Sequence, residues 1–436
     1  MISSDVASTL NENFSGLTLE LIKNQLENQG RNCYGRRHSD EAKKFALTLN
    51  FYSPRAYEYV RSVFALPHSR SLSCWTSSVE CAAGLFQDVF KKLKLLVKNK
   101  PEQADCSLIC DAMSIKKNIF YNRSTGKYDG YIDYGKDVIV EDEDVVAKEA
   151  LVIMLVSHRG QWKYPVGYVL IDEIKADALN SLIARILDLC VSHDLIVRTV
   201  TLDGTATNLS AMKLFGCKLG KSIDDIDGSF SYERFDHKLY FTPDPPHMLK
   251  LARNALCELG VFVDGEGKLI KWSYIQKLHE EQTSLGLKFA NKLSNSHINI
   301  KRHKMNARLA AQTLSSSVAD ALQFLMESGH PEFIHAGATI LFILDRLFDL
   351  LNAKSPQGKG FKQPIPLNNE FLWKDIIKNS ITYLANLKDA SHVPLLQHRR
   401  KTFVLGFITS ALSTQGLALY LLNKSTNPFS YLLPYL

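Results

Sequence analysis

The feature that most constrains this 436-residue chain is a change of hydrophobic period near residue 105, followed by a second change near residue 256. Between these points, short apolar runs of strand length alternate with helical patterns, whereas the flanking segments are almost wholly helical. The predicted order is three strands, a helix, a strand, a helix and a strand. The predicted strands are 106–115, 127–134, 149–157 with 164–171 (a third strand or a hairpin), 196–202 and 238–242.

This order predicts an α/β plus α protein with an RNase H-like mixed sheet, although other α/β sheets give a similar string. The segment before the sheet reads as short helices, with Ser39 as a predicted N-cap and turns at Ser53-Pro54 and Leu66-Pro67. Such a segment fits a helix-turn-helix region, and small helical linkers look similar. Arg55, Arg61 and Arg70 would then be phosphate contacts or ordinary surface arginines.

Charge is concentrated in one part of the chain. The formal net charge is +7, and the segment 268–308 alone contains nine Lys and Arg against two acids. A cluster of that kind predicts a phosphate-bearing partner, nucleic acid or nucleotide, with a solvated helical face as the alternative. The apolar runs 340–351 and 403–412 are too short for a membrane helix, so no membrane partner is expected.

Two aspartates stand at the positions where an RNase H-like sheet carries its metal ligands. Asp111 interrupts the apolar first strand, and Asp203 ends the β-branched strand 196–202. Two carboxylates brought together repel each other unless Mg²⁺ or Mn²⁺ lies between them. We therefore predict that Asp111 and Asp203 bind a divalent metal for phosphodiester chemistry.

Other assignments of these acids stay open. Asp133, on the predicted second strand, is a rival for the first acid, although the first strand is central in this fold. Taken singly, Asp111 reads better as a strand-edge acid and Asp203 as a turn former before Gly204; the two together, at the expected places, favour the metal site. His247 at a predicted helix start either faces the site or caps the helix.

Several stretches, in order along most of the chain, together resemble the P-element type of DNA transposase, including relatives that carry a THAP zinc finger. The quoted stretches are Phe45–Tyr57 with Leu66-Pro67-His68, Cys110–Lys117, Gly130–Gly135, Pro165–Tyr168, Thr201–Gly204, Asp244–Asn254 and Lys304–Ala307.

The resemblance implies a nuclear protein that binds DNA and forms oligomers, with an RNase H-like core interrupted by an all-helical insertion that binds GTP. It implies that Lys292 meets phosphate and that Asp349 and Asn352 contact guanine; a capping role for Asp349 is the alternative. The predicted segments are 1–37 (helical, possible dimerisation), 38–104 (helix-turn-helix), 105–255 (core), 256–425 (nucleotide-binding insertion) and 426–436 (returning strand).

Two departures from the family pattern shape the functional prediction. The chain has no THAP finger at its N-terminus, and it stops within Tyr431–Leu436, which resembles the strand before the family's third acid. We therefore expect a truncated or domesticated cut-and-paste transposase with impaired cleavage and strand transfer. The alternative is a non-catalytic DNA- and GTP-binding protein derived from a transposase.

Overall fold

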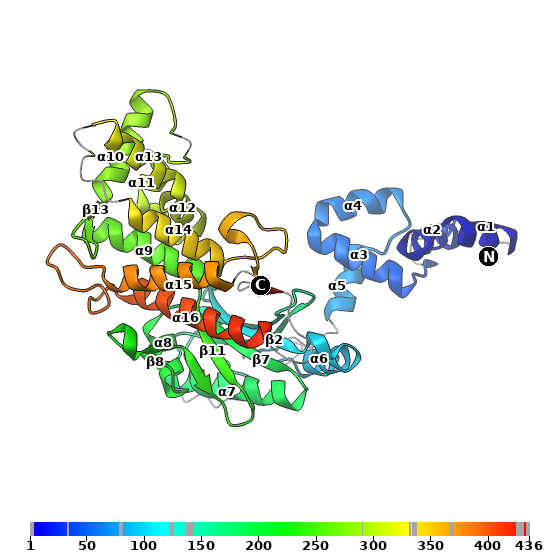
Figure 1. The fold of residues 1–436 in the computed structure, drawn as a ribbon. Helices are drawn as coiled ribbons and strands as arrows, with labels where there is room; N and C mark the ends of the chain where they lie inside the picture. The colour runs from blue at the N-terminus through cyan, green and yellow to red at the C-terminus, as the bar shows by residue number, and fades with distance from the viewer. Residues whose placement is uncertain are drawn as a thin grey trace. The chain divides into compact units, whose positions relative to one another are not determined.

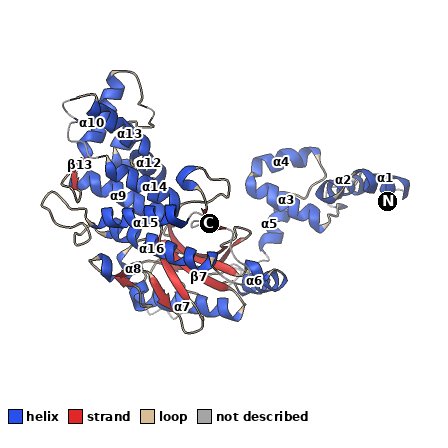
Figure 2. Cartoon of the chain, in the orientation of Figure 1, coloured by secondary structure: helices blue, strands red, loops and turns tan. Residues whose placement is uncertain are grey.

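The fold comprises two separately packed units, Met1–Ala82 and Ala83–Leu436, each described here by itself (Figure 1). The computed structural model describes residues 4–32, 35–77, 82–122, 126–136, 144–289, 291–330, 333, 338–366, 370–423 and 431–432. The first unit is helical, and the second contains a large sheet with helices around it (Figure 2). The predicted α/β plus α class is confirmed.

The first unit is a set of short helices around a small apolar core. Ser39 accepts a hydrogen bond from the Ala42 amide, as predicted for an N-cap, and Ser53 caps the next helix, whose first residue is Pro54. Tyr57 is buried in the core, and its hydroxyl donates to the Pro67 carbonyl. The helices are α1 Ser4–Asn13, α2 Gly16–Asn28, α3 Asp40–Tyr52, α4 Pro54–Val63 and α5 Ser69–Ser77.

The second unit is organised by a seven-stranded sheet in the order β1-β6-β5-β2-β7-β11-β10. β7 lies parallel to both β2 and β11, and the other neighbours are antiparallel. Most of β7 is buried, as expected for a central strand covered on both faces. The strands are β1 Gly84–Leu85, β2 Asp105–Ser114, β5 Glu149–Ser157, β6 Lys163–Ile171, β7 Ile196–Leu202, β10 Ser229–Ser231 and β11 Lys238–Pro243.

The predicted strand 127–134 does not enter this sheet as a full strand. Lys127–Asp129 forms β4, which pairs with β3 (Phe120–Asn122) in a separate two-stranded sheet. Only Asp133 reaches the large sheet, through an isolated bridge to Leu170 on β6. The segments 149–157 and 164–171 are two strands of one hairpin, and this hairpin supplies the second and third strands.

Helices cover both faces of the sheet, with α7 and α16 on opposite sides (Figure 1). Ser410 and Ser413 of α16 donate to the Pro243 and Phe241 carbonyls of β11. Lys94 joins α6 to the end of α7 by donating to the Ser192 carbonyl. These helices are α6 Gln87–Asn99, α7 Ala176–Ser192, α8 Ala206–Leu214 and α16 Thr402–Leu422.

The segment after β11 is mostly helical, as predicted from residue 256 onward. Its helices are α9 Pro245–Leu259, α10 Trp272–Ser284, α11 Asn295–Ile298, α12 Ala307–Thr313, α13 Ser316–Glu327, α14 Thr339–Leu351 and α15 Glu370–Ala385. Short strand pairs also lie outside the large sheet. Before β11, β8 Lys218–Leu219 pairs with β9 Ile226–Asp227. After β11, β12 Val261–Val263 pairs with β13 Leu269–Lys271, and β14 Ile365–Pro366 pairs with β15 Tyr431–Leu432. The remainder of the predicted returning strand, 433–436, lies outside the described residues.

The expectation about apolar length was wrong for α16. This helix has 21 residues, and by length and composition it is apolar enough to cross a membrane. The packing of α16 accounts for that composition, because most of its residues are buried and it contacts β11, α9 and α15. A Cβ on Gly406 would lie 2.1 Å from the Met248 sulfur, so the close approach to α9 requires glycine there.

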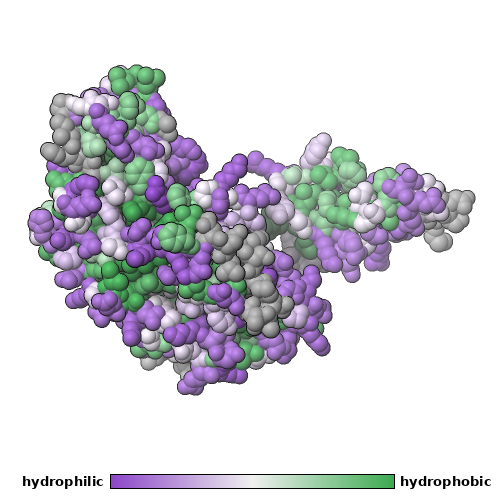
Figure 3. All heavy atoms as spheres, viewed as in Figure 1, coloured by the Kyte–Doolittle hydropathy of each residue, from purple (hydrophilic) through white to green (hydrophobic). Residues whose placement is uncertain are grey.

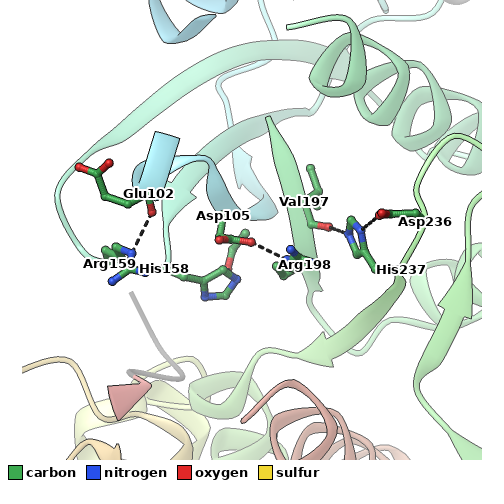
Figure 4. Close-up of polar contacts among 9 residues, drawn as sticks. Glu102, Asp105, His158, Arg159, Val197, Arg198, Asp236 and His237 are labelled. Carbon is green, nitrogen blue, oxygen red and sulfur yellow. Dashed lines mark hydrogen bonds and ion pairs between the residues drawn. The ribbon is translucent and has the colours of Figure 1, made fainter. Parts of the chain in front are cut away.

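A network of buried polar side chains lies where β2 and β7 begin (Figure 4). Arg198 Nε donates to Asp105 Oδ1 at 2.6 Å, and both side chains are almost fully buried. The guanidinium also lies 4.7 Å from the Tyr420 ring centroid on α16. Beside this pair, Ser107 Oγ bonds His158 Nε2 at 3.2 Å. Side-chain interactions therefore stabilise this end of the sheet in addition to the backbone hydrogen bonds between β2 and β7.

His158 makes the stability of the second unit depend on pH. Burial lowers its pKa to about 4, with the Arg198 charge adding to the effect and Asp105 opposing it. Below about pH 6.5 His158 is protonated in the unfolded chain but stays neutral in the folded state. The free energy of unfolding therefore falls as the pH drops from about 6.5 to 4. The loss amounts to about 3 kcal/mol.

Urea unfolding at several pH values checks this prediction. We expect His158→Gln to flatten the dependence between pH 4 and 6.5 while changing stability less at pH 8. An unchanged slope in the variant would mean that other groups cause the acid sensitivity.

Candidate metal and nucleic-acid site

Asp111 and Asp203 lie at matching positions on neighbouring parallel strands. The register between β2 and β7 pairs Ile109 with Thr201, and each aspartate follows two residues later. Side chains two residues apart share one face of a strand, so both carboxylates are on the same face at the carboxyl end of the pair. Asp111 is exposed and Asp203 is partly buried. The sequence-based prediction of their proximity therefore agrees with the strand register.

Asp244 is a third carboxylate at this edge, and sequence reasoning missed its role. It follows β11, whose Pro243 pairs with Leu202, and its amide donates to the Leu202 carbonyl at 2.9 Å. Its carboxylate accepts from the His247 amide at 3.0 Å and thereby caps α9. A signal was present in the sequence, since an acid directly after a strand and before Pro-Pro marks a strand-to-helix turn.

The pKa of Asp244 responds to the charges of both other aspartates. Burial raises the pKa of Asp244 to about 6, and the charges of Asp111 and Asp203 raise it further. The His247 amide and Lys250 oppose that shift. Burial also lowers the pKa of His247, and the charges of Asp203 and Asp111 oppose that shift. A local excess of negative charge of this kind attracts a cation.

The loop after β7 fixes the Asp203 carboxylate. Its Oδ1 accepts from the Thr205 amide at 3.1 Å and from the Asn208 side chain. A Cβ on Gly204 would lie 2.6 Å from Met248 Cε and 2.8 Å from Thr402 Cγ2. Gly204 is therefore needed for close packing, and it lets the strand end against α9 and α16.

The donor atoms suit a hard divalent cation. Carboxylate oxygens are the ligands that Mg²⁺ prefers, with water completing its octahedron. Across the described ranges, no three His, Cys, Asp or Glu side chains converge closely enough to hold an ion by themselves. The residues fit a metal bound by two carboxylates and completed by water or substrate oxygens, rather than an all-protein cage.

The structure separates Asp133 from these acids. Asp133 bridges to Leu170 on β6, and β5 and β2 lie between β6 and β7. Its carboxylate accepts from the Gly135 amide within its own turn. The geometry therefore favours Asp111 over Asp133 as the neighbour of Asp203. The acidic run 141–144 lies outside the described residues except for Asp144.

The structure brings together two of the three residues that the resemblance assigned to GTP. Asp349 is on the last turn of α14, and Asn352 is its C-cap, three residues later. Asp349 lies 3.5 Å from Lys362, and burial raises its pKa to about 6. Asn352 Oδ1 is buried without a hydrogen-bond partner, which is costly unless a donor arrives. Lys292 is exposed between α10 and α11.

Family models match three parts of the chain. Residues 1–75 match the transposable element P transposase-like HTH domain, and residues 81–216 match the TNP-like RNase H N-terminal domain. Residues 246–364 match the TNP-like GTP-binding insertion domain. The last match ends before α15, whereas the predicted insertion extends to residue 425.

Two curated proteins are similar along most of the chain. The human DNA transposase THAP9 is 28% identical over 410 residues, covering 91% of this chain and 44% of that protein. The Drosophila melanogaster transposable element P transposase is 26% identical over 427 residues, covering 96% and 51%. The chain therefore spans about half the length of the curated relatives it matches.

A solved structure has the same fold. The Drosophila P element transposase strand transfer complex superposes with a TM-score of 0.75 at 21% identity, covering 99% of this chain and 89% of that chain. The likeness extends over the helical first unit and the sheet-containing second unit.

Proposed function

We propose that this chain, which matches models of a transposable element P transposase-like HTH domain and of two TNP-like domains, is a transposase-derived protein that binds DNA and cuts its phosphodiester backbone with a divalent metal ion. Cut-and-paste transposition, strand transfer and a nuclear location are proposed for it on the same ground. The observation that supports this proposal most is the register of β2 and β7, in which Asp111 and Asp203 occupy matching positions, with Asp244 at the end of β11 beside them.

The residues present suit that chemistry. Asp111 and Asp203 would hold Mg²⁺ or Mn²⁺, which when bound activates water or a hydroxyl and stabilises the leaving oxygen of a phosphodiester. Thr205 and Asn208 hold the Asp203 carboxylate in one orientation. The Asp244 carboxylate is held by the His247 amide and adds negative charge beside the other two.

The test is nicking of a supercoiled plasmid by the intact chain with Mg²⁺ or Mn²⁺. Metal-dependent nicks would support cleavage, and their loss in chelator would tie them to the metal. If no nicking occurs at any metal concentration, cleavage is not the function of this chain, and the second candidate stands.

That second candidate is a non-catalytic DNA- and GTP-binding protein, and one observation favours it. The half-buried Asp349 carboxylate and the unpartnered Asn352 oxygen lie on one helix end, and both are acceptors. Guanine presents adjacent N–H donors that adenine lacks, so these acceptors fit GTP better than ATP. Lys292 is proposed as a phosphate contact.

Calorimetry with GTP and ATP tests this site. We expect Asp349→Ala to weaken GTP binding by about 10- to 100-fold, since a hydrogen bond to a charged group contributes about 1.5–3 kcal/mol. Asp320→Ala, on the exposed face of α13, is the matched control and should bind normally. Equal affinity for GTP and ATP, or an unaffected Asp349 variant, would remove the guanine-specific site.

We also propose the domain organisation and a homo-oligomeric state. The part of the predicted helix-turn-helix region 38–104 that lies in the first unit would bind DNA, whereas β1 and α6 belong to the sheet-containing unit. In the first unit, α2 exposes Leu17 and Leu26, which we propose as a dimerising surface. Arg55 and Arg70 are exposed and available to phosphate, whereas Arg61 is paired with Glu58. The mass of the intact chain in solution tests the oligomeric part.

A further inference from the structure

A cavity of about 590 Å³ lies between α9, the segment after α11 and the residues that lead into α16. The floor is apolar, with Leu251, Ala255 and Ile300 among the lining residues. The charged residues of the lining are Glu258, Lys301, Lys304, Arg399 and Arg400.

The cavity is strongly positive. Four cationic side chains line it, and Glu258 is the single carboxylate among its described lining residues. Arg399 and Arg400 both pair with Glu258, so each guanidinium is held at the rim while keeping further N–H donors. Positive charge on the walls of a concave surface concentrates anionic ligands.

The fold holds the basic wall in place from α9. Arg253 is fully buried, and its Nη2 donates to the His303 and Lys304 carbonyls at 2.9 Å each. Asn254 Nδ2 donates to the Lys304 carbonyl at 3.2 Å. Because the buried Arg253 donates to two carbonyls of this exposed basic segment, it fixes the backbone that carries Lys301 and Lys304.

The cavity adjoins the carboxylate site. α9 begins at Asp244, and its residues Leu251, Asn254 and Glu258 line the cavity further along the same helix. Thr402, another lining residue, packs against Gly204, the residue after Asp203. The cavity and the carboxylate site are therefore linked through α9 and through Thr402.

We propose that this cavity binds the sugar-phosphate backbone of the DNA strand that enters the carboxylate site. The inference rests on the proposed DNA function and deepens it by naming the contacting residues. A strand backbone needs several spaced cations and an apolar surface for its sugars, and the cavity supplies both. Its described lining has no aromatic side chain on which a nucleotide base could stack, so a backbone fits better than a free nucleotide.

Fluorescence anisotropy with labelled oligo(dT) in EDTA tests the assignment without cleavage. The double variant Arg399→Ala/Arg400→Ala is expected to bind about tenfold or more weakly at low salt. Its slope of log affinity against log salt should fall by about 1.4, at about 0.7 per lost single-strand contact. Glu258→Gln should have the opposite effect and bind more tightly, because it frees both arginines and removes the one carboxylate.

The controls separate this inference from the proposed cleavage. Lys213→Ala/Lys218→Ala removes two exposed charges outside the cavity and should change affinity and slope little. Because binding is measured in EDTA, its result does not depend on metal-dependent cleavage.

Three results would overturn the assignment. Normal affinity in the double-arginine variant would do so even if nicking were observed, and so would wild-type protein that does not bind oligo(dT). If GTP displaces oligo(dT) and the double variant loses GTP to the same extent, the cavity holds a triphosphate and not a strand.

Discussion

Asp111→Ala and Asp203→Ala are each expected to reduce metal-dependent DNA nicking by about a thousandfold or more. A bound divalent ion contributes several kcal/mol of transition-state stabilisation, and each 1.36 kcal/mol is a factor of ten in rate. Either variant leaves a single carboxylate of the neighbouring pair, so the ion loses half of its proposed protein ligands. Initial nicking rates at several Mg²⁺ concentrations measure the effect.

Two comparisons make the nicking result specific. Asp133→Ala removes the rival acid, which lies beside β6, and should nick at the wild-type rate. Asp111 is exposed, so its replacement should leave the thermal unfolding midpoint nearly unchanged. Nicking that survives in Asp111→Ala but disappears in Asp133→Ala would show that Asp133, and not Asp111, is the first acid.

Arg198→Ala is expected to lower the free energy of unfolding of the second unit by about 3–5 kcal/mol. The change leaves Asp105 charged and buried without its guanidinium, and removal of one partner of a buried ion pair costs about that much. It also removes the contact with the Tyr420 ring on α16. Urea unfolding followed by circular dichroism measures the loss.

A double variant separates the effect of the ion pair from simple loss of packing. Arg198→Met/Asp105→Leu removes both charges and should regain most of the stability, since an apolar pair often replaces a buried ion pair at little cost. Lys91→Ala breaks the exposed pair with Asp88 and should cost less than about 1 kcal/mol. Equal losses for Arg198→Ala and the double variant would show that packing, and not the charge, is responsible.

Local patterns in the sequence were sufficient to locate the strands β2, β5, β6, β7 and β11, and to single out Asp111 and Asp203 as candidate acids. The β-branched run 196–202 became the central strand β7, and an acid inside an apolar strand pointed to Asp111. Both signals lie within one element, which is why the period of the residues carries them. The cap at Ser39 was equally local and is confirmed.

Features that depend on distant pairing were not accessible from the sequence. Asp244 gains its place only when β11 pairs with β7, and Arg198 meets Asp105 across 93 residues of chain. The segment 127–134 has strand composition, but the hairpin of β5 and β6 takes the positions next to β2. Helix α16 also continues beyond residue 412, and its Ser410 and Ser413 hydroxyls are satisfied only by carbonyls of β11, which is distant in the sequence.

The nucleotide residues divide in the same way. Asp349 and Asn352 are three residues apart, so helical spacing alone places them together on α14. Lys292 is on another segment, and its distance from them depends on how the insertion packs. Its role remains a prediction that the calorimetric experiment can extend with Lys292→Ala.

Iron-mediated backbone cleavage tests most directly whether Asp111 of β2 and Asp203, directly after β7, hold one divalent ion. With hydrogen peroxide and ascorbate added, Fe²⁺ bound in place of Mg²⁺ generates hydroxyl radicals that cut the chain beside the metal. We predict cuts near residues 111 and 203, with further cutting near 244, competition by excess Mg²⁺, and loss of all three in Asp111→Ala. Cuts confined to other segments, or cuts that persist unchanged in Asp111→Ala, would show that Asp111 and Asp203 do not hold the ion together.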